Sequence, residues 1–161
     1  MATGDSLVLL GPMGNRPPAS GFATLDLRGD FVVLDYDDTT NESAQFDVII
    51  PSHYGGGDLC AKVKWTSSTA TSGNAKLRVE LIRLNAGDNL ASVPSADDTD
   101  DFVVAAPSTS GDLVLDESDE MSVSGLTAGD MLRVVVSRLA SDASDTMSGD
   151  LELVSFELQE A

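Results

Sequence analysis

Apolar side chains recur at every second position in several short stretches of this chain, and this period of two constrains the fold more than any other feature. In residues 58–65, DLCAKVKW, two lysines fall on one face and four apolar residues on the other: Leu59, Ala61, Val63 and Trp65. Residues 76–84, KLRVELIRL, repeat the pattern. Successive side chains of a strand point to opposite faces, so both stretches are predicted to be half-buried β-strands. The small polar residues 66–73 between them predict a hairpin.

Further apolar runs follow each other between turn signals at intervals of about 8 to 15 residues, and helical periodicity is nearly absent. The runs are FATLDL, FVVLDY, AQFDVII, FVVAA, DLVLDE, MLRVVVSRL and DLELVSFEL. We expect residues 131–139 to lie centrally in a sheet, and the last run to close the domain with Val154, Phe156 and Leu158 facing inward. The prediction is an all-β fold, an antiparallel, jelly-roll-like β-sandwich of about 8–9 strands.

The first twenty residues differ from the rest. Residues 11–20, GPMGNRPPAS, hold three prolines and two glycines, which excludes a helix there. We therefore expect residues 1–20 to form an extended N-terminal arm and residues 21–161 to form the sandwich domain. The apolar stretch SLVLL within the arm fits either a disordered tail or a segment that docks on a neighbour.

The charge balance excludes several classes of function. Acidic residues number 27 and basic residues 9, which gives a formal net charge of -18. Binding to phosphates depends on Lys and Arg, so neither nucleic acid nor an anionic membrane is expected as a partner. Cys60 is the single cysteine, which excludes an internal disulfide and predicts a small core residue. The start of the chain has no basic region and only a short apolar run, so no classical export signal is predicted.

Residues 31–40, FVVLDYDDTT, contain the Asp-x-Asp-x-Thr pattern of haloacid-dehalogenase phosphatases. In that chemistry Asp35 would be the nucleophile, Asp37 the general acid/base and Thr39 a phosphate contact. The pattern requires a parallel α/β sheet with helices behind it, whereas another strand, AQFDVII, follows here. We therefore interpret the stretch as a strand and an acidic turn, and reject the phosphatase.

Two groups of acids offer hard oxygen ligands of the kind that Ca²⁺ binds: Asp35, Asp37, Asp38 and Glu42 in one group, and Asp97, Asp98, Asp100 and Asp101 in the other. Neither has the register of an EF-hand loop, so both are predicted to be solvated acidic loops without a metal. His53 is the only histidine and no nucleophile motif accompanies it. The RGD tripeptide at residues 28–30 is predicted to be a tight turn. The sequence thus predicts no catalytic, metal-binding or cofactor-binding residue, and no enzyme.

Residues 35–84 and 129–158 resemble a family of small structural proteins of tailed bacteriophages. The acidic turn that leads to the PSHYGGGDL stretch, the WTSSTATSG stretch and the turn at residues 142–150 carry the resemblance. It implies a jelly-roll protomer, a homotrimer, that sits on the outer surface of the capsid. As a decoration or cement protein of the virion it would bridge neighbouring copies of the major capsid protein.

The alternative is a phage tail or fibre module that binds a host surface glycan. Glycan sites on β-sandwiches usually expose aromatic rings, and this chain has few. Alternation places Trp65 in the core, which leaves Tyr54, in the glycine-rich loop, as the ring expected to be exposed.

Overall fold

The computed structural model describes residues 4–161, and its elements are almost all strands. In chain order they are β1 (Ser6–Leu10), a 3-10 turn (Pro12–Gly14), β2 (Thr24–Arg28), β3 (Phe31–Tyr36), β4 (Glu42–Ile49), β5 (Leu59–Ser67), β6 (Asn74–Leu84), β7 (Asp98–Ala105), β8 (Val114–Glu117), β9 (Met131–Arg138) and β10 (Leu151–Glu160). The prediction of an all-β antiparallel sandwich is confirmed.

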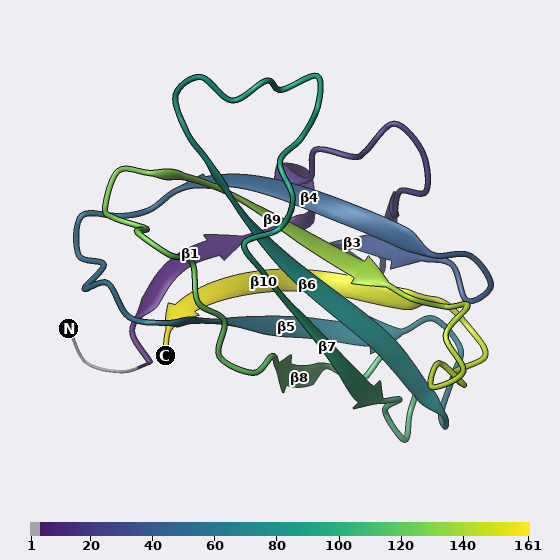
Figure 1. Cartoon of the computed structure of the whole chain (residues 1–161). Helices are drawn as coiled ribbons and strands as arrows, with labels where there is room; N and C mark the ends of the chain where they lie inside the picture. Colours follow the sequence, from purple (N-terminus) through teal and green to yellow (C-terminus); the bar gives the residue numbers. More distant parts are fainter. Residues whose placement is uncertain (1–3) are drawn as a thin grey trace.

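The strands form two sheets that pack face to face (Figure 1). The six-stranded sheet has the order β2-β3-β10-β5-β8, and β1 also pairs with β10; the four-stranded sheet has the order β4-β9-β6-β7. β10 pairs with β5 along one edge, and with β3 and then β1 along the other. The last strand therefore closes the domain on its earliest strands, and β9 lies centrally, both as predicted.

The predicted hairpin between the two alternating stretches is wrong. β5 belongs to the six-stranded sheet and β6 to the four-stranded sheet, so residues 68–73 carry the chain from one layer to the other. Alternation identifies the face of each strand that is buried, but it does not identify the neighbouring strand. β2 and β3 do form a hairpin, with Arg28 paired to Phe31.

The core lies between the inner faces of the two sheets. The rings of Phe46 and Phe156 stack across it, with centroids 6.0 Å apart and an interplanar angle of 6°. Trp65 is fully buried, as predicted, and its indole Nε1 donates a hydrogen bond to Asp116. Other large, fully buried side chains are Tyr36, Leu34, Ile50, Leu59, Leu77, Leu81, Met121 and Leu132.

One residue of the last strand faces the other way from the prediction. The pairing of β10 with β5 shifts register between Leu153 and Ser155. A bulge of this kind inserts an extra residue, so Leu153 and Phe156 both face the core. Val154 is left on the outer face, and its predicted inward position is wrong.

The apolar stretch near the N-terminus pairs with the chain's own last strand. β1 runs antiparallel to β10, and Leu7 is buried in the core cluster. The N–H of Gly4 donates to the carbonyl of Glu160, so the first and last described segments of the chain lie side by side (Figure 1). SLVLL is thus neither of the two expected alternatives, since it extends the six-stranded sheet of its own domain. The division at residue 20 stays a prediction.

A fully buried ion pair joins the two sheets near the end of β9. The side chain of Arg138 is 0% exposed, and its guanidinium makes two hydrogen bonds, of 2.9 and 3.0 Å, to the carboxylate of Asp145. The remaining donors reach three carbonyls, those of Tyr36, Gly149 and Met147. Arg138 therefore links β9 of one sheet to the end of β3 in the other and to the turn before β10.

Replacing Arg138 by Met should lower the free energy of unfolding by about 3–5 kcal/mol, because it leaves a buried carboxylate without a partner. Urea unfolding would measure the loss. Arg78→Met is the matched control: Arg78 also makes two hydrogen bonds to one carboxylate, that of Asp101, but both side chains are partly exposed. That control should cost less than about 1 kcal/mol. Equal losses in the two variants would contradict the structural role of the buried pair.

Candidate binding site

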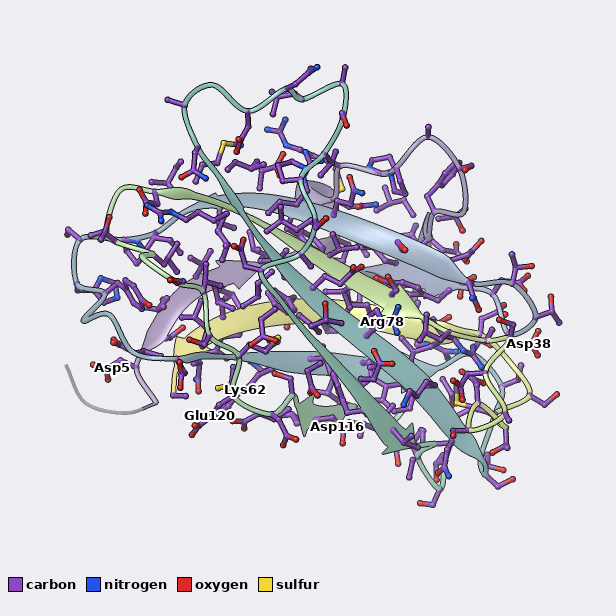
Figure 2. All side chains as sticks on the ribbon, in the orientation of Figure 1. Asp5, Asp38, Lys62, Arg78, Asp116 and Glu120 are labelled. Atoms are coloured by element: carbon purple, nitrogen blue, oxygen red, sulfur yellow. The ribbon has the colours of Figure 1, made fainter. Side chains whose placement is uncertain are left out.

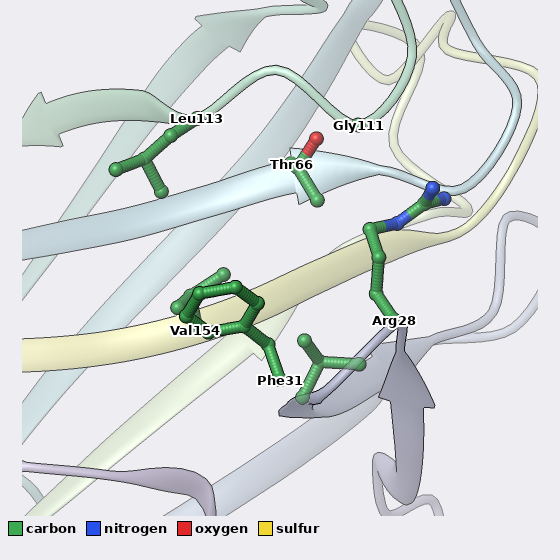
Figure 3. Close-up of a pocket in the computed structure, with 7 residues that line it drawn as sticks. Arg28, Phe31, Thr66, Gly111, Leu113 and Val154 are labelled. Carbon is green, nitrogen blue, oxygen red and sulfur yellow. The ribbon is translucent and has the colours of Figure 1, made fainter.

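A small, mostly apolar cavity opens on the outer face of the six-stranded sheet, the face turned away from the core. Its volume is about 190 Å³. The lining comes from the β2–β3 hairpin, β5, β10 and the segment that leads into β8 (Figure 3). The lining residues are Arg28, Phe31, Val33, Thr66, Gly111, Leu113 and Val154. Segments that are far apart in the sequence meet here, so only the folded chain has this cavity.

Phe31 is the exposed aromatic ring of the site, with 69% of the residue accessible to solvent. The hairpin turn positions it: Gly29 has a φ of 58°, a left-handed conformation that glycine adopts without steric cost. Alternate residues of β3 face opposite ways, so Phe31 and Val33 point outward while Leu34 packs in the core. Leu113, which also lines the cavity, is exposed as well, and an apolar surface of several exposed side chains is typical of a binding site.

Arg28 forms one wall of the cavity, and most of its guanidinium is already used. Nε pairs with the carboxylate of Glu152, and Nη2 donates to the carbonyls of Ser67, at 3.1 Å, and Ser68, at 2.7 Å. Nη1 makes no hydrogen bond within residues 4–161, so it can donate to a ligand. The RGD tripeptide is the predicted tight turn, and its arginine is held against its own sheet.

Thr66 lies on the outer face of β5 and is 2% exposed. Its hydroxyl oxygen is buried and has no hydrogen-bond partner among the described residues. Figure 3 shows the side chain at the cavity wall, with the hydroxyl directed towards Gly111. Gly111 has no side chain, and a Cβ atom there would lie 3.3 Å from Nη1 of Arg28. The absence of that atom leaves room for the arginine.

Charge around the molecule is strongly negative, and nearly all of the positive charge is already paired. Eight of the nine Lys and Arg side chains take part in ion pairs with acids within residues 4–161. The labelled acids Asp5, Asp38, Asp116 and Glu120 in Figure 2 lie at separate places around the sandwich. Arg28, the cationic side chain that lines the cavity, is already paired with the carboxylate of Glu152. Among the described residues, the cavity therefore has no unpaired cation for an anionic ligand.

The first group of predicted acids lies next to the cavity, further along β3. Thr24, Asp35, Asp37, Glu42 and Asp150 line a hollow of about 200 Å³. Burial, together with the negative charges of Asp150 and Glu152, raises the pKa of Asp35 to about 6. Asp37 instead accepts hydrogen bonds from the side chain and backbone of Thr39, which hold its pKa below the usual range.

These bonds give Asp37 and Thr39 a structural role in the turn between β3 and β4. Asp35 lies on the outer face of an antiparallel sheet. Residues 4–161 contain no parallel sheet flanked by helices. The geometry that an aspartyl phosphatase requires is therefore missing.

The second group of acids does not form a loop. Asp98, Asp100 and Asp101 lie on β7, and Asp97 directly precedes it. Asp97 accepts from the N–H of Arg83, Asp98 from the N–H of Ser122 and Asp100 from the N–H of Asp119. Asp101 pairs with Arg78. Each carboxylate thus holds a strand or loop in place, and no group of three or more His, Cys, Asp or Glu in the described part of the chain is arranged to hold a metal.

The remaining candidate residues have structural roles. Tyr54, expected to be an exposed ring, is partly buried against the core, and its hydroxyl donates to the carbonyl of Gly57 at 2.6 Å. The ring of His53 contacts the carbonyl of Ser6. Cys60 is buried, and burial raises the pKa of its thiol to about 11, which disfavours a thiolate.

Phe31 is the residue that the sequence analysis missed. The signal was present, because strict alternation from Leu34 and Tyr36 in the core places Phe31 and Val33 on the opposite face. Arg28 was considered only as part of the RGD tripeptide, and Thr66 only as part of a polar loop.

No protein-family model matches the chain, and no curated protein matches its sequence. Solved structures match its fold. The xylan-binding CBM22-1 domain of Xyn10C from Paenibacillus barcinonensis superposes with a TM-score of 0.53 at 10% identity, over 99% of this chain and 96% of that one. The CBM36-1 domain of a multidomain xylanase from the hindgut metagenome of Trinervitermes trinervoides gives 0.53 at 8% identity, over 96% and 97%.

A third structure, the exo-beta-1,3-galactanase from Phanerochaete chrysosporium with galactose, gives a TM-score of 0.51 at 10% identity. The match covers 96% of this chain but only 29% of that enzyme, so the chain is similar to one part of it. At these identities the likeness shows the fold: a β-sandwich jelly roll of the kind that forms carbohydrate-binding modules.

These likenesses correct the expectation drawn from phage proteins. The neighbours are carbohydrate-binding modules, and nothing in them indicates a capsid decoration protein. The prediction of a virion cement protein, a homotrimer with the major capsid protein as its partner, is therefore wrong. The features behind the resemblance, acidic turns and glycine loops between short strands, belong to the sandwich architecture and do not specify a partner. A location on the outer capsid surface stays a prediction. No helix within residues 4–161 is long and apolar enough to span a membrane.

Asp35→Asn should stabilise the protein above pH 6. The pKa of Asp35 is raised in the folded state from 3.8 to about 6, so the folded chain holds this proton more tightly than the unfolded chain. Stability from this group is present below pH 4 and is lost as pH rises towards 6. Urea unfolding across this range should show a gain of about 1–2 kcal/mol for the variant above pH 6 and none below pH 4.

Asp37→Asn is the control for that experiment. The pKa of Asp37 is shifted downward, so neutralising it should lower stability at neutral pH. A loss of stability in both variants would contradict the assignment of opposite environments to the two carboxylates.

Proposed function

We propose that this protein is a non-catalytic binding module for an uncharged glycan, and that the cavity beside Phe31 is its binding site. The observation that carries the proposal is the combination of an exposed aromatic ring, apolar walls and a free donor, Nη1 of Arg28, at one cavity. A sugar ring has an apolar face of C–H groups and a rim of hydroxyls. An aromatic ring can pack against that face while the donor binds a hydroxyl.

Similarity of fold supports this function. Of the two modules with TM-scores of 0.53, one comes from a multidomain xylanase and the other is named as the xylan-binding domain of Xyn10C. Glycan binding was part of the alternative prediction, a phage tail or fibre module that binds a host surface glycan. Membership of a phage tail or fibre stays a prediction, and adsorption of the protein to host cells would test it.

Size and charge narrow the ligand. Cavities that bury a drug-sized molecule have volumes of about 300–1,000 Å³, so a cavity of about 190 Å³ fits a single ring of a longer chain. Uronates, sulfated sugars and sialic acids would meet a net charge of -18 and an arginine already bound to Glu152. A neutral polysaccharide meets neither penalty.

Phe31→Ala should weaken binding to unsubstituted xylan oligosaccharides by about tenfold, because the variant removes the ring that packs against the sugar. Isothermal titration calorimetry would measure the change. Phe22→Ala is the matched control, since Phe22 is also an exposed phenylalanine but lines a separate hollow around Pro17 and Leu25. Equal affinity of the Phe31 variant and the wild type would show that the binding site does not include Phe31. A panel of neutral galactan and glucan would then show whether any glycan binds.

Binding should also discriminate by charge. Neutral chains should be retained in affinity electrophoresis to the same extent at low and high salt, while polygalacturonate should not be retained. Retention by polygalacturonate that falls with added salt would show that the charge argument is wrong, even if the position of the site is correct.

A further inference from the structure

Thr66 stands out because its hydroxyl is buried without a partner. Most buried polar atoms in proteins are hydrogen-bonded, and an orphaned hydroxyl destabilises the fold that contains it. The residue is 2% exposed and its Oγ1 has no partner within residues 4–161. Valine has the same shape and would remove this cost. A threonine in this position therefore serves no internal contact of the domain.

The position of Thr66 within the sheet explains why the hydroxyl is unpaired. β8 pairs with β5 only as far as Val114 opposite Trp65, so Thr66 lies just beyond the end of that ladder. The segment around Gly111 passes over it, and the N–H of Gly111 donates to the carbonyl of Ser67. On the other side Thr66 pairs with Glu152, whose carboxylate is taken by Arg28. In this arrangement the hydroxyl has no hydrogen-bond partner within residues 4–161.

The same side chain lines the cavity beside Phe31. Apart from Arg28 and Thr66, the lining is glycine or apolar: Phe31, Val33, Gly111, Leu113 and Val154. A rotation of about 120° about χ1 can move the threonine hydroxyl into the position that its methyl group occupied, so the hydroxyl can meet a polar atom that enters this space.

We infer that Thr66 is a specificity-determining residue, whose hydroxyl is satisfied by a hydroxyl of the bound sugar ring. This inference rests on the proposed function. A site built to hydrogen-bond a ligand hydroxyl rejects a ligand that lacks it, because the protein group is then left unpaired. The ligand class is therefore a neutral sugar ring with a free hydroxyl next to its apolar face. A ring whose hydroxyls are methylated should bind poorly.

Two substitutions separate the hydroxyl from the shape of the side chain. Thr66→Val removes the hydroxyl and keeps the volume, so binding to xylan oligosaccharides should weaken by about tenfold. Its urea midpoint without ligand should equal or exceed that of the wild type, because no internal hydrogen bond is lost. Thr66→Ser keeps the hydroxyl and should bind within about twofold of the wild type.

The test is decisive because Thr66→Val is expected to weaken binding without lowering the stability of the protein. If the role of Thr66 were purely structural, Thr66→Val would lower the stability of the protein, and that result would overturn the inference. Wild-type affinity in Thr66→Val would also overturn it, and if Phe31→Ala still weakened binding, the proposed function would stand. No binding by the wild type to xylan, galactan or glucan would overturn both. Titration with a methylated xylan oligosaccharide completes the test: loss of affinity with the wild type but not with Thr66→Val supports a contact through this hydroxyl.

Discussion

The buried guanidinium of Arg138 is the interaction on which the arrangement of the sheets depends. A charge removed from water is tolerated only when its donors are occupied, and this guanidinium meets that condition with one carboxylate and three carbonyls. Two of those carbonyls, of Tyr36 and Gly149, lie at the end of β3 and just before β10. β3 and β10 also carry Phe31 and Val154, so the carbonyls that Arg138 binds lie next to two of the strands that line the cavity.

The surface of the protein carries a large excess of negative charge. Positive side chains are used almost entirely for internal pairing, and the remaining acids cap turns, hold strands or face solvent. The excess of acidic residues is unfavourable for the ionised form of Asp35, since burial beside other carboxylates raises its pKa to about 6. A module with this surface repels polyanions, and its contacts with an uncharged ligand must come from shape, apolar packing and hydrogen bonds. The cavity beside Phe31 supplies these three features.

Alternation in the sequence predicted the buried faces of β5 and β6, since Trp65 and Leu77 lie where the period of two places them. It could not predict which strands become neighbours, because β5 and β6 each bury one face in the same core from opposite layers. Alternation places Phe31 on the outer face, but it did not single out the cavity. Phe31 follows a turn and begins an apolar run that looks uniformly buried, and the approach of Gly111 to Arg28 is a long-range contact without a local signal. The polar loop around residue 70 gave no indication that Thr66, at the end of a strand, would lose its partners.

The bulge in β10 shows how such a site arises from a sandwich whose core is otherwise regular. β10 pairs with β5 on both sides of the shift, so Leu153 and Phe156 keep their places in the core. Val154 lies on the outer face, where it lines the cavity with Phe31. Without it, strict alternation would place Val154 outward but turn Phe156 outward too, and the stacked pair with Phe46 would be lost. The inserted residue therefore keeps Phe156 in its ring contact within the core, while Val154 remains an apolar wall outside the sheet.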